Sequence, residues 1–261
     1  MTSHIAKGDN PMVCAVRLVE EPELKDPILV EGLPGIGLVA NIAVAYLIRK
    51  LDATFFGEIR SASFPDMSIT DEEGSLKSPF VQLYYHKGKG KDRRDLVLLY
   101  GNTQALTRRG QYELCGRILD IAERLGCRYV ITLGGYRPGR PVTEPNLYYV
   151  ASDRETAKVA AGLGAQVLGG QIFGVAGLLI GLAGLRGMEG FCLLAETPGT
   201  YPDREASVAV LKAVRGVLGL KLDPEDLTKV EELADVLSPF DFGALAKREQ
   251  KTKETKPDWF I

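Results

Sequence analysis

The chain has 261 residues, 45% of them hydrophobic, so it can form one large domain whose core needs neither a metal nor a disulfide. Its 32 basic and 34 acidic side chains nearly balance, which argues against a nucleic-acid-binding protein, because such domains carry clustered positive charge. The four cysteines form no C-x-x-C motif, so neither a zinc site nor a disulfide framework is expected, and a reducing cytoplasm is the expected location.

Short apolar strands alternate with helices along the first half of the chain. We predict strands at the apolar segments 13–19, 28–33, 54–61, 80–86 and 96–100. Apolar residues recur at helical spacing over 36–50 and again over 103–125, where Thr103 is the expected N-cap and Gly126 the expected terminator.

The second half of the chain continues this alternation. Strands are predicted at 129–134, 146–151 and 190–195, and helices at 154–167, 175–185 and 203–218, the last of them capped by Asp203. Strand–helix alternation predicts an α/β fold, a three-layer domain over residues 1–220 in which helices flank a mixed, largely parallel sheet.

One apolar segment, residues 159–185, carries no charged side chain and is long enough to span a bilayer. Its eight glycines, among them the pair Gly169-Gly170, divide it into pieces too short to cross a membrane. We therefore predict a helix, a turn and a second buried helix in this segment, and no association with a membrane.

The C-terminal forty residues differ in character from the rest. Residues 221–240 contain Asp223-Pro224, which favours a helix start, followed by an apolar stripe that predicts docking on the core. Residues 241–261 are predicted to be a charged flexible tail, since eight of the twelve side chains at 247–258 are charged, as in a solvated tether.

The tail ends in Trp259, Phe260 and Ile261, and Trp259 is the only tryptophan of the chain. Either these three residues fold back on their own domain or lie disordered, or they anchor a partner protein. We favour the anchor, because aromatic side chains dominate the energetics of protein interfaces. The free C-terminal carboxylate adds a group that a lysine or backbone amides can bind.

Three blocks of the sequence resemble one known family. They are Leu-Val-Glu-Gly-Leu-Pro-Gly-Ile-Gly-Leu-Val-Ala-Asn-Ile-Ala at 29–43, Gly-Asn-Thr-Gln at 101–104 with 130–136, and 174–180 with 194–199 and Pro202-Asp203. The blocks occur in this order and cover roughly residues 13–237. Together they resemble the proteasome assembly chaperone 2 family, in its archaeal branch.

The resemblance implies a fold similar to nucleoside phosphorylases and hydrolases, homo-oligomerisation, and ATP-independent help in assembling the α subunits of the 20S proteasome. A second chaperone or adaptor subunit is a further candidate partner. Archaeal members end in a hydrophobic–tyrosine–any tripeptide, the motif that proteasome activators insert between α subunits. Trp259 matches the hydrophobic position and Ile261 the last, while Phe260 keeps the ring of the expected tyrosine and lacks its hydroxyl.

An alternative function, a nucleotide- or phosphate-binding enzyme, rests on Gly35-Ile-Gly37-Leu-Val-Ala40. A G-x-G-x-x-A between a strand and a helix, with Glu58 eighteen residues further on, has the context of a dinucleotide-binding fingerprint. Glycines there let a pyrophosphate approach backbone amides at the helix N-terminus. The same glycines serve tight strand–helix packing, and Glu31 at the strand end would place a carboxylate close to any pyrophosphate, which disfavours binding.

Catalytic groups are otherwise scarce. The chain has two histidines and lacks the metalloprotease, nucleophile-elbow and P-loop motifs. Glu196 and Asp203 flank a Pro/Gly loop, where a hydrogen-bonded loop and a helix cap explain them better than a catalytic carboxylate pair. We therefore predict a non-catalytic assembly or adaptor protein with no catalytic residue, no cofactor and no metal.

Overall fold

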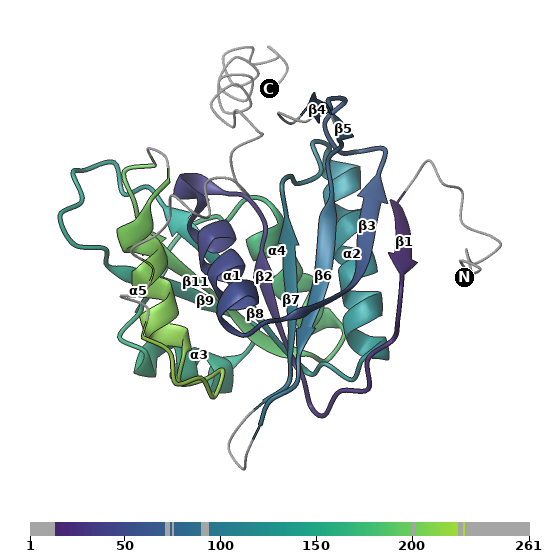
Figure 1. Cartoon of the computed structure of the whole chain (residues 1–261). Coiled ribbons are helices and arrows are strands. Elements are labelled where there is room, and N and C mark those ends of the chain that lie inside the picture. The colour runs from purple at the N-terminus through teal and green to yellow at the C-terminus, as the bar shows by residue number, and fades with distance from the viewer. Residues whose placement is uncertain are drawn as a thin grey trace, which may run out of the picture.

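The computed structural model describes residues 14–70, 74, 76–89, 94–199, 202–223 and 227. In this part of the chain, a nine-stranded mixed sheet lies between two layers of helices (Figure 1). Its strands, in spatial order, are β1 (Cys14–Leu18), β3 (Thr54–Ser61), β6 (Val81–His86), β7 (Leu96–Gly101), β2 (Ile28–Gly32), β8 (Tyr129–Tyr136), β11 (Glu189–Glu196), β9 (Leu147–Ala151) and β10 (Gln166–Val167). A separate antiparallel pair is formed by β4 (Ile69–Thr70) and β5 (Leu76–Lys77).

The four central strands, β7, β2, β8 and β11, run parallel to one another. Antiparallel pairs add β6, β3 and β1 on one side and β9 on the other, and β10 lies parallel to β9 at the edge. The predicted mixed sheet is thus confirmed, with its parallel part at the centre. Because parallel strands end at the same edge of a sheet, the loops after these four strands lie together.

Helices cover both faces of the sheet. In the described part of the chain, α1 (Val39–Lys50), α3 (Arg154–Gly162) and α5 (Arg204–Val214) pack on one face, and α2 (Arg108–Arg124) and α4 (Val175–Leu185) pack on the other. Figure 1 shows α1 and α5 in front of the sheet and α2 and α4 behind it. The predicted three-layer α/β architecture is confirmed, whereas a nucleoside phosphorylase-like topology stays a prediction.

The central strand β7 shows how the sequence pattern produces these layers. Successive side chains of a strand point to opposite faces, so Leu96 and Leu98 enter the core beneath α1, and Val97 and Leu99 enter the core beneath α2. All four are fully buried, as a continuously apolar strand predicts.

Helix α2 begins later than predicted, at Arg108. The cap is Thr107, whose hydroxyl oxygen accepts a hydrogen bond of 3.0 Å from the amide of Gly110. Thr103, the predicted cap, instead donates from its hydroxyl to the carbonyl oxygen of Gln104 at 3.0 Å. The prediction was wrong because residues 102–106 are held in a loop by tertiary contacts, which override the local capping signal.

The uncharged segment 159–185 divides into the end of α3, the short strand β10 and helix α4. The predicted helix over 154–167 is too long, because the chain adopts a left-handed conformation at Gly164, with φ +82°, and then pairs with β9. None of the described helices is both long enough and apolar enough to cross a bilayer.

After α5 the chain returns to the α1–α5 surface. The hydroxyl of Tyr46 donates to the carbonyl oxygen of Asp223 at 3.1 Å, and Nε of Arg204 donates to the carbonyl oxygen of Leu227 at 3.0 Å. The Leu227 side chain is buried in the core beneath these helices. Of the predicted docking segment 221–240, only 221–223 and 227 are described, and the predicted tail 241–261 lies outside the described residues.

Candidate functional site

The turn between β2 and α1 crosses the carboxyl edge of the sheet at its centre. A short 3₁₀ helix, η1 (Ile36–Leu38), precedes α1. Gly37 has φ +65°, a left-handed conformation that glycine adopts without steric cost. Its carbonyl oxygen accepts a hydrogen bond of 2.9 Å from the amide of Asp203, so the turn is joined to the loop before α5.

The three residues of the predicted ligand loop have different environments. A Cβ atom added to Gly35 would meet no other atom within 4 Å, whereas one added to Gly37 would lie 2.7 Å from Thr197 Oγ1 and 3.3 Å from Asp203 Cβ. Ala40 is buried in the first turn of α1. Close packing against the loop after β11 is sufficient to explain Gly37, and of the three residues only Gly35 faces open space. Ligand binding at this turn stays a prediction.

Asp203 gives this turn a negatively charged neighbour. Its carboxylate accepts hydrogen bonds from the hydroxyl of Thr197 and, at 2.9 Å, from the amide of Ala206, so it caps α5 as predicted. A pyrophosphate bound at Gly37 would lie close to this carboxylate, and the like charges would repel each other.

We expect NAD, NADP, ATP and AMP to leave the melting temperature of the protein unchanged. A ligand that binds only the folded state, present at a hundredfold excess over its dissociation constant, stabilises that state by about 3 kcal/mol. Differential scanning fluorimetry measures this shift. A rise of several degrees with one of these nucleotides, absent in a Gly35→Leu variant that fills the open space, would show that the turn is a ligand site.

Two buried amide side chains hold the loops of this edge together. Nδ2 of Asn41 donates to the carbonyl oxygens of Gly32, at 3.0 Å, and Gly101, at 2.8 Å, and so joins the ends of β2 and β7. Oδ1 of Asn102 accepts from the amide of Phe80 at 2.8 Å. The bonds to Gly32 and Gly101 satisfy carbonyl groups of buried residues.

Gln104 joins three separate segments. Its Nε2 donates to the carbonyl oxygen of Pro34 at 2.6 Å, and its Oε1 accepts from the amide of Val175 at 3.1 Å. The turn after β2, the loop after β7 and the first residue of α4 are therefore tied at one side chain. Sequence reasoning missed this role, because the three segments are far apart along the chain and no local pattern marks their contact.

Glu31, the strand-end carboxylate that sequence reasoning placed close to any bound pyrophosphate, is buried. Strand alternation places it with Leu29 and Leu33 on the α2–α4 side of the sheet, where it is 1% exposed. Oε1 accepts a hydrogen bond of 2.7 Å from the amide of Leu33, and Oε2 has no partner in the described part of the chain. Burial raises the pKa of Glu31 to about 8, against the lowering effect of the Leu33 hydrogen bond. At neutral pH the group is an uncharged acid inside the core.

A second buried carboxylate, Glu196, lies at the end of β11. It accepts two hydrogen bonds from Nη2 of Arg140, at 2.6 and 2.8 Å, and others from Nδ2 of Asn146, at 2.9 Å, and the Tyr148 hydroxyl, at 3.0 Å. Burial by itself would raise the pKa of Glu196, but the hydrogen bonds from Asn146 and Tyr148 and the charge of Arg140 outweigh it and hold this pKa below its ordinary value. As predicted, Glu196 fastens a loop.

The remaining candidate groups are buried or lie outside the described residues. The predicted anchor, Trp259, Phe260 and Ile261, lies outside the described residues, so its role stays a prediction. All four cysteines are buried, and burial raises the pKa of three of them to about 12, namely Cys115, Cys127 and Cys192. Within the described ranges, no three His, Cys, Asp or Glu side chains are grouped to hold a metal ion.

A model of the PAC2 family matches residues 29–236, which include the whole carboxyl edge described above. The chain belongs to the PAC2 family. In this chain, internal hydrogen bonds join the segments that meet at Gln104 and Gly37.

Individual proteins are similar to this chain over most of its length. The structure resembles PbaB of Pyrococcus furiosus, an archaeal proteasome activator, with 34% identity and a TM-score of 0.78 over 87% of this chain and 98% of that one. It also resembles P. furiosus PbaA, an archaeal homolog of proteasome-assembly chaperone, with 27% identity and a TM-score of 0.71 over 91% and 99% of the two chains. The uncharacterized protein MJ1210 of Methanocaldococcus jannaschii is 30% identical over 234 residues, 87% of this chain and 89% of that protein.

Proposed function

We propose that this PAC2-family chain is a non-catalytic, ATP-independent assembly chaperone or adaptor of the proteasome. The observation that carries the proposal is the similarity to PbaB and PbaA, an archaeal proteasome activator and an archaeal homolog of proteasome-assembly chaperone, over 87% and 91% of this chain. The partners are proteasome α subunits or the 20S core particle, bound by a homo-oligomer of this chain.

The chemistry of the carboxyl edge supports a non-catalytic function. At this edge of an α/β sheet an enzyme would present reactive groups to a substrate. Here Asn41, Asn102, Gln104 and Glu196 direct their polar atoms at the chain's own backbone and side chains. The thiols of the described residues are buried and their pKa values, where shifted, lie far above neutrality, so they are poor nucleophiles at neutral pH.

Docking is assigned to the C-terminal residues Trp259, Phe260 and Ile261. The twelve residues 247–258 span about 40 Å when fully extended, so the end of the chain can reach well beyond the domain. The two aromatic side chains would enter an apolar groove between α subunits, while the carboxylate of Ile261 pairs with a basic group of the partner. Several tails on one oligomer raise one another's effective concentration, so weak individual contacts sum to useful avidity.

One residue added after Ile261 is expected to abolish binding to the α ring. The extension moves the carboxylate and leaves both aromatic side chains intact, so it should reduce binding nearly as far as the double change Trp259→Ala plus Phe260→Ala. A pull-down of 20S particles on each immobilised variant measures the effect. A Thr255→Ala variant, altered in the charged segment only, is the matched control and should bind like the wild type.

Normal binding by the extended chain would exclude a role for the carboxylate and with it the activator-like insertion. A melting temperature lowered by several degrees in either variant would instead place the three residues in the protein's own core.

A further inference from the structure

Three exposed apolar side chains gather around Gln104 at the carboxyl edge of the sheet. Ile36, Leu106 and Phe173 are 46%, 55% and 81% exposed. Each lies two residues from Gln104 or from a residue that is hydrogen-bonded to its side chain. We call these three side chains the edge patch. Apolar side chains grouped on a surface mark interaction sites, whereas single ones are common.

Positive charge borders the edge patch. Helix α2 begins at this edge with Arg108 and Arg109 and has no acidic residue in its first turn, although the helix dipole disfavours cations there. Arg109 is paired with Glu113 at 2.7 Å, whereas Arg108 pairs with no carboxylate of the described residues. Arg137, which follows β8, donates to the carbonyl oxygen of Gly199 at 3.5 Å and has no such carboxylate either. The edge therefore suits an occupant that is apolar on one side and acidic on the other.

The described chain ends beside this patch. Leu227 is its last described residue, and Nε of Arg204 donates to the Leu227 carbonyl oxygen at 3.0 Å. The neighbouring Asp203 donates from its amide to the carbonyl oxygen of Gly37 at 2.9 Å. Gly37 directly follows Ile36 of the edge patch. The residues after Leu227 therefore start close to the patch, at the end of the sheet that carries it.

The sequence that follows has the composition that this edge requires. Three apolar residues continue from Leu227 at helical spacing, and three acidic residues fall on the other side of such a helix. They are Val230, Leu233 and Leu237, and Glu231, Glu232 and Asp235. Ten helical residues span about 15 Å. The ends of β11 and β7 are three strand spacings apart, roughly 14 Å, so residues 228–237 are long enough to cross from one to the other.

We propose that residues 228–237 pack as an amphipathic helix across the edge patch of their own chain. Their apolar stripe covers Ile36 and Leu106, and their acidic side chains approach Arg108 and Arg137. The burial removes apolar surface from water, and the carboxylates compensate the arginines at the start of α2 and after β8.

The proposal commits to this segment because its start is already held beside the patch. A tethered segment has an effective concentration that a separate molecule does not reach. Sequence analysis expected residues 221–240 to dock on the core and named no surface, and the proposal supplies one. It goes beyond the proteasome proposal and does not depend on it. Its consequence is that the tail, residues 241–261, leaves the molecule from the carboxyl edge.

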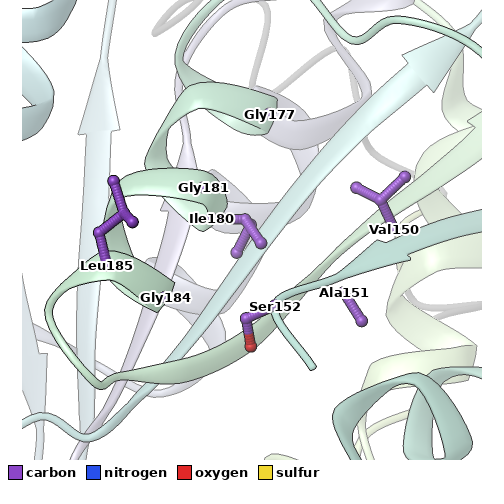
Figure 2. Close-up of a pocket in the computed structure, with 8 residues that line it drawn as sticks. All are labelled: Val150, Ala151, Ser152, Gly177, Ile180, Gly181, Gly184 and Leu185. Carbon is purple, nitrogen blue, oxygen red and sulfur yellow. The ribbon is translucent and has the colours of Figure 1, made fainter. Parts of the chain in front are cut away.

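Another exposed apolar surface of the described chain supplies a control. Figure 2 shows a hollow of about 430 Å³ between α4 and the end of β9, lined in part by Leu185, which is 84% exposed. Helix α4 begins at the carboxyl edge, so Leu185, its last residue, lies toward the opposite edge. The hollow is on the α2–α4 face, whereas Leu227 is buried beneath α1 and α5, so the sheet separates the two. Residues 228–237 are therefore not expected to reach it.

Hydrogen exchange followed by mass spectrometry tests the docking. In the wild type we expect the amides of 228–237 to exchange about tenfold or more slowly than those of a free peptide of that sequence. The double change Ile36→Asp plus Leu106→Asp places two charges on exposed positions of the edge patch and should remove this protection, while circular dichroism shows a folded domain. Leu185→Asp is the matched control and should keep the protection. Exchange at the peptide rate in the wild type, or full protection in the double variant, would overturn the proposal.

A cross-link shows which chain supplies the segment. The four native cysteines are buried, so Leu106→Cys plus Leu233→Cys adds two accessible thiols. Each thiol adds across the double bond of one maleimide of a short bis-maleimide, and its hydrogen goes to the neighbouring maleimide carbon, so no oxidant is needed. We expect a link within one chain, which keeps the subunit mass of 28.4 kDa apart from the reagent. The control pair Leu185→Cys plus Leu233→Cys should give none.

The other outcomes of the cross-link contradict the proposal. A product of twice the subunit mass would mean that a second copy supplies the segment, and the absence of any link would exclude its contact with Leu106. Neither experiment contains proteasome particles, so a failure here leaves the proteasome proposal to its own binding test.

Discussion

Replacing Glu31 by glutamine is expected to make the stability of the protein nearly independent of pH between about 5 and 8.5, where the wild type should lose about 4 kcal/mol. The variant keeps the oxygen that accepts the hydrogen bond from the amide of Leu33, at 2.7 Å in the wild type, and it cannot ionise. Urea unfolding followed by fluorescence or circular dichroism at several pH values measures the difference.

The sign follows from where the proton is held. In the folded protein burial raises the pKa of Glu31 from 4.5 to about 8, so between these values the folded state keeps a proton that the unfolded state releases. Rising pH therefore favours the unfolded state through this window, and the stabilisation present below pH 4.5 is lost as the pH approaches 8. At low pH the variant should be less stable than the wild type by about 1–2 kcal/mol, since its amide hydrogens replace an acid proton in a site with no partner for Oε2. The two stability curves should cross.

The groups that face Glu31 set the upper limit of this experiment. Cys115 on α2 and Cys192 on β11 are coupled to it, and burial raises the pKa of both thiols from 9.0 to about 12. Measurements below pH 8.5 keep the contribution of these thiols small, because most of them remain protonated even in the unfolded chain, where the pKa is the ordinary 9.0. Glu113→Gln, at the surface of α2, is the matched control and should run parallel to the wild type. A Glu31→Gln curve that also ran parallel would contradict a protonated acid in the core.

Gly135→Ala is expected to cost about 3 kcal/mol, the upper end of the usual range for overpacking a core. A Cβ on this residue of β8 would lie 2.2 Å from the carbonyl oxygen of Ile36 and 2.8 Å from Thr197 Cγ2. A backbone oxygen cannot rotate away as a side chain does, so the turn between β2 and α1 must shift. The hydrogen bond between Gly37 and Asp203 would be strained by the same movement.

Gly116→Ala is the opposite case and the control for Gly135→Ala. On α2 the new Cβ would meet only Nη2 of Arg186, at 3.9 Å, so the change should stabilise the protein by about 1 kcal/mol through helix propensity. Equilibrium unfolding of both variants measures the two effects. Equal stability of the two variants would mean that the turn moves freely, and its role as a fixed scaffold would be wrong.

The sequence by itself determined the elements whose signals are local. The strand at 54–61 and the helix at 175–185 coincide with β3 and α4, and the Asp203 cap is present, because side-chain periodicity and capping depend on residues a few positions apart. The alternation of strands and helices was sufficient to predict the α/β class and the mixed sheet. The same local signals failed at Thr103, where contacts from Gln104 to distant segments hold the chain in a loop.

Only the tertiary structure decided which residues meet across long sequence separations. It placed β2 between β7 and β8, and so brought Pro34, Gln104 and Val175 into one hydrogen-bonded group. It turned the side chain of Glu31 into the core, where burial opposes its charge, although the sequence position at a strand end suggested a site near a ligand. Burial and the shape of a surface depend on all elements packed around a residue, and no segment of the sequence contains that information.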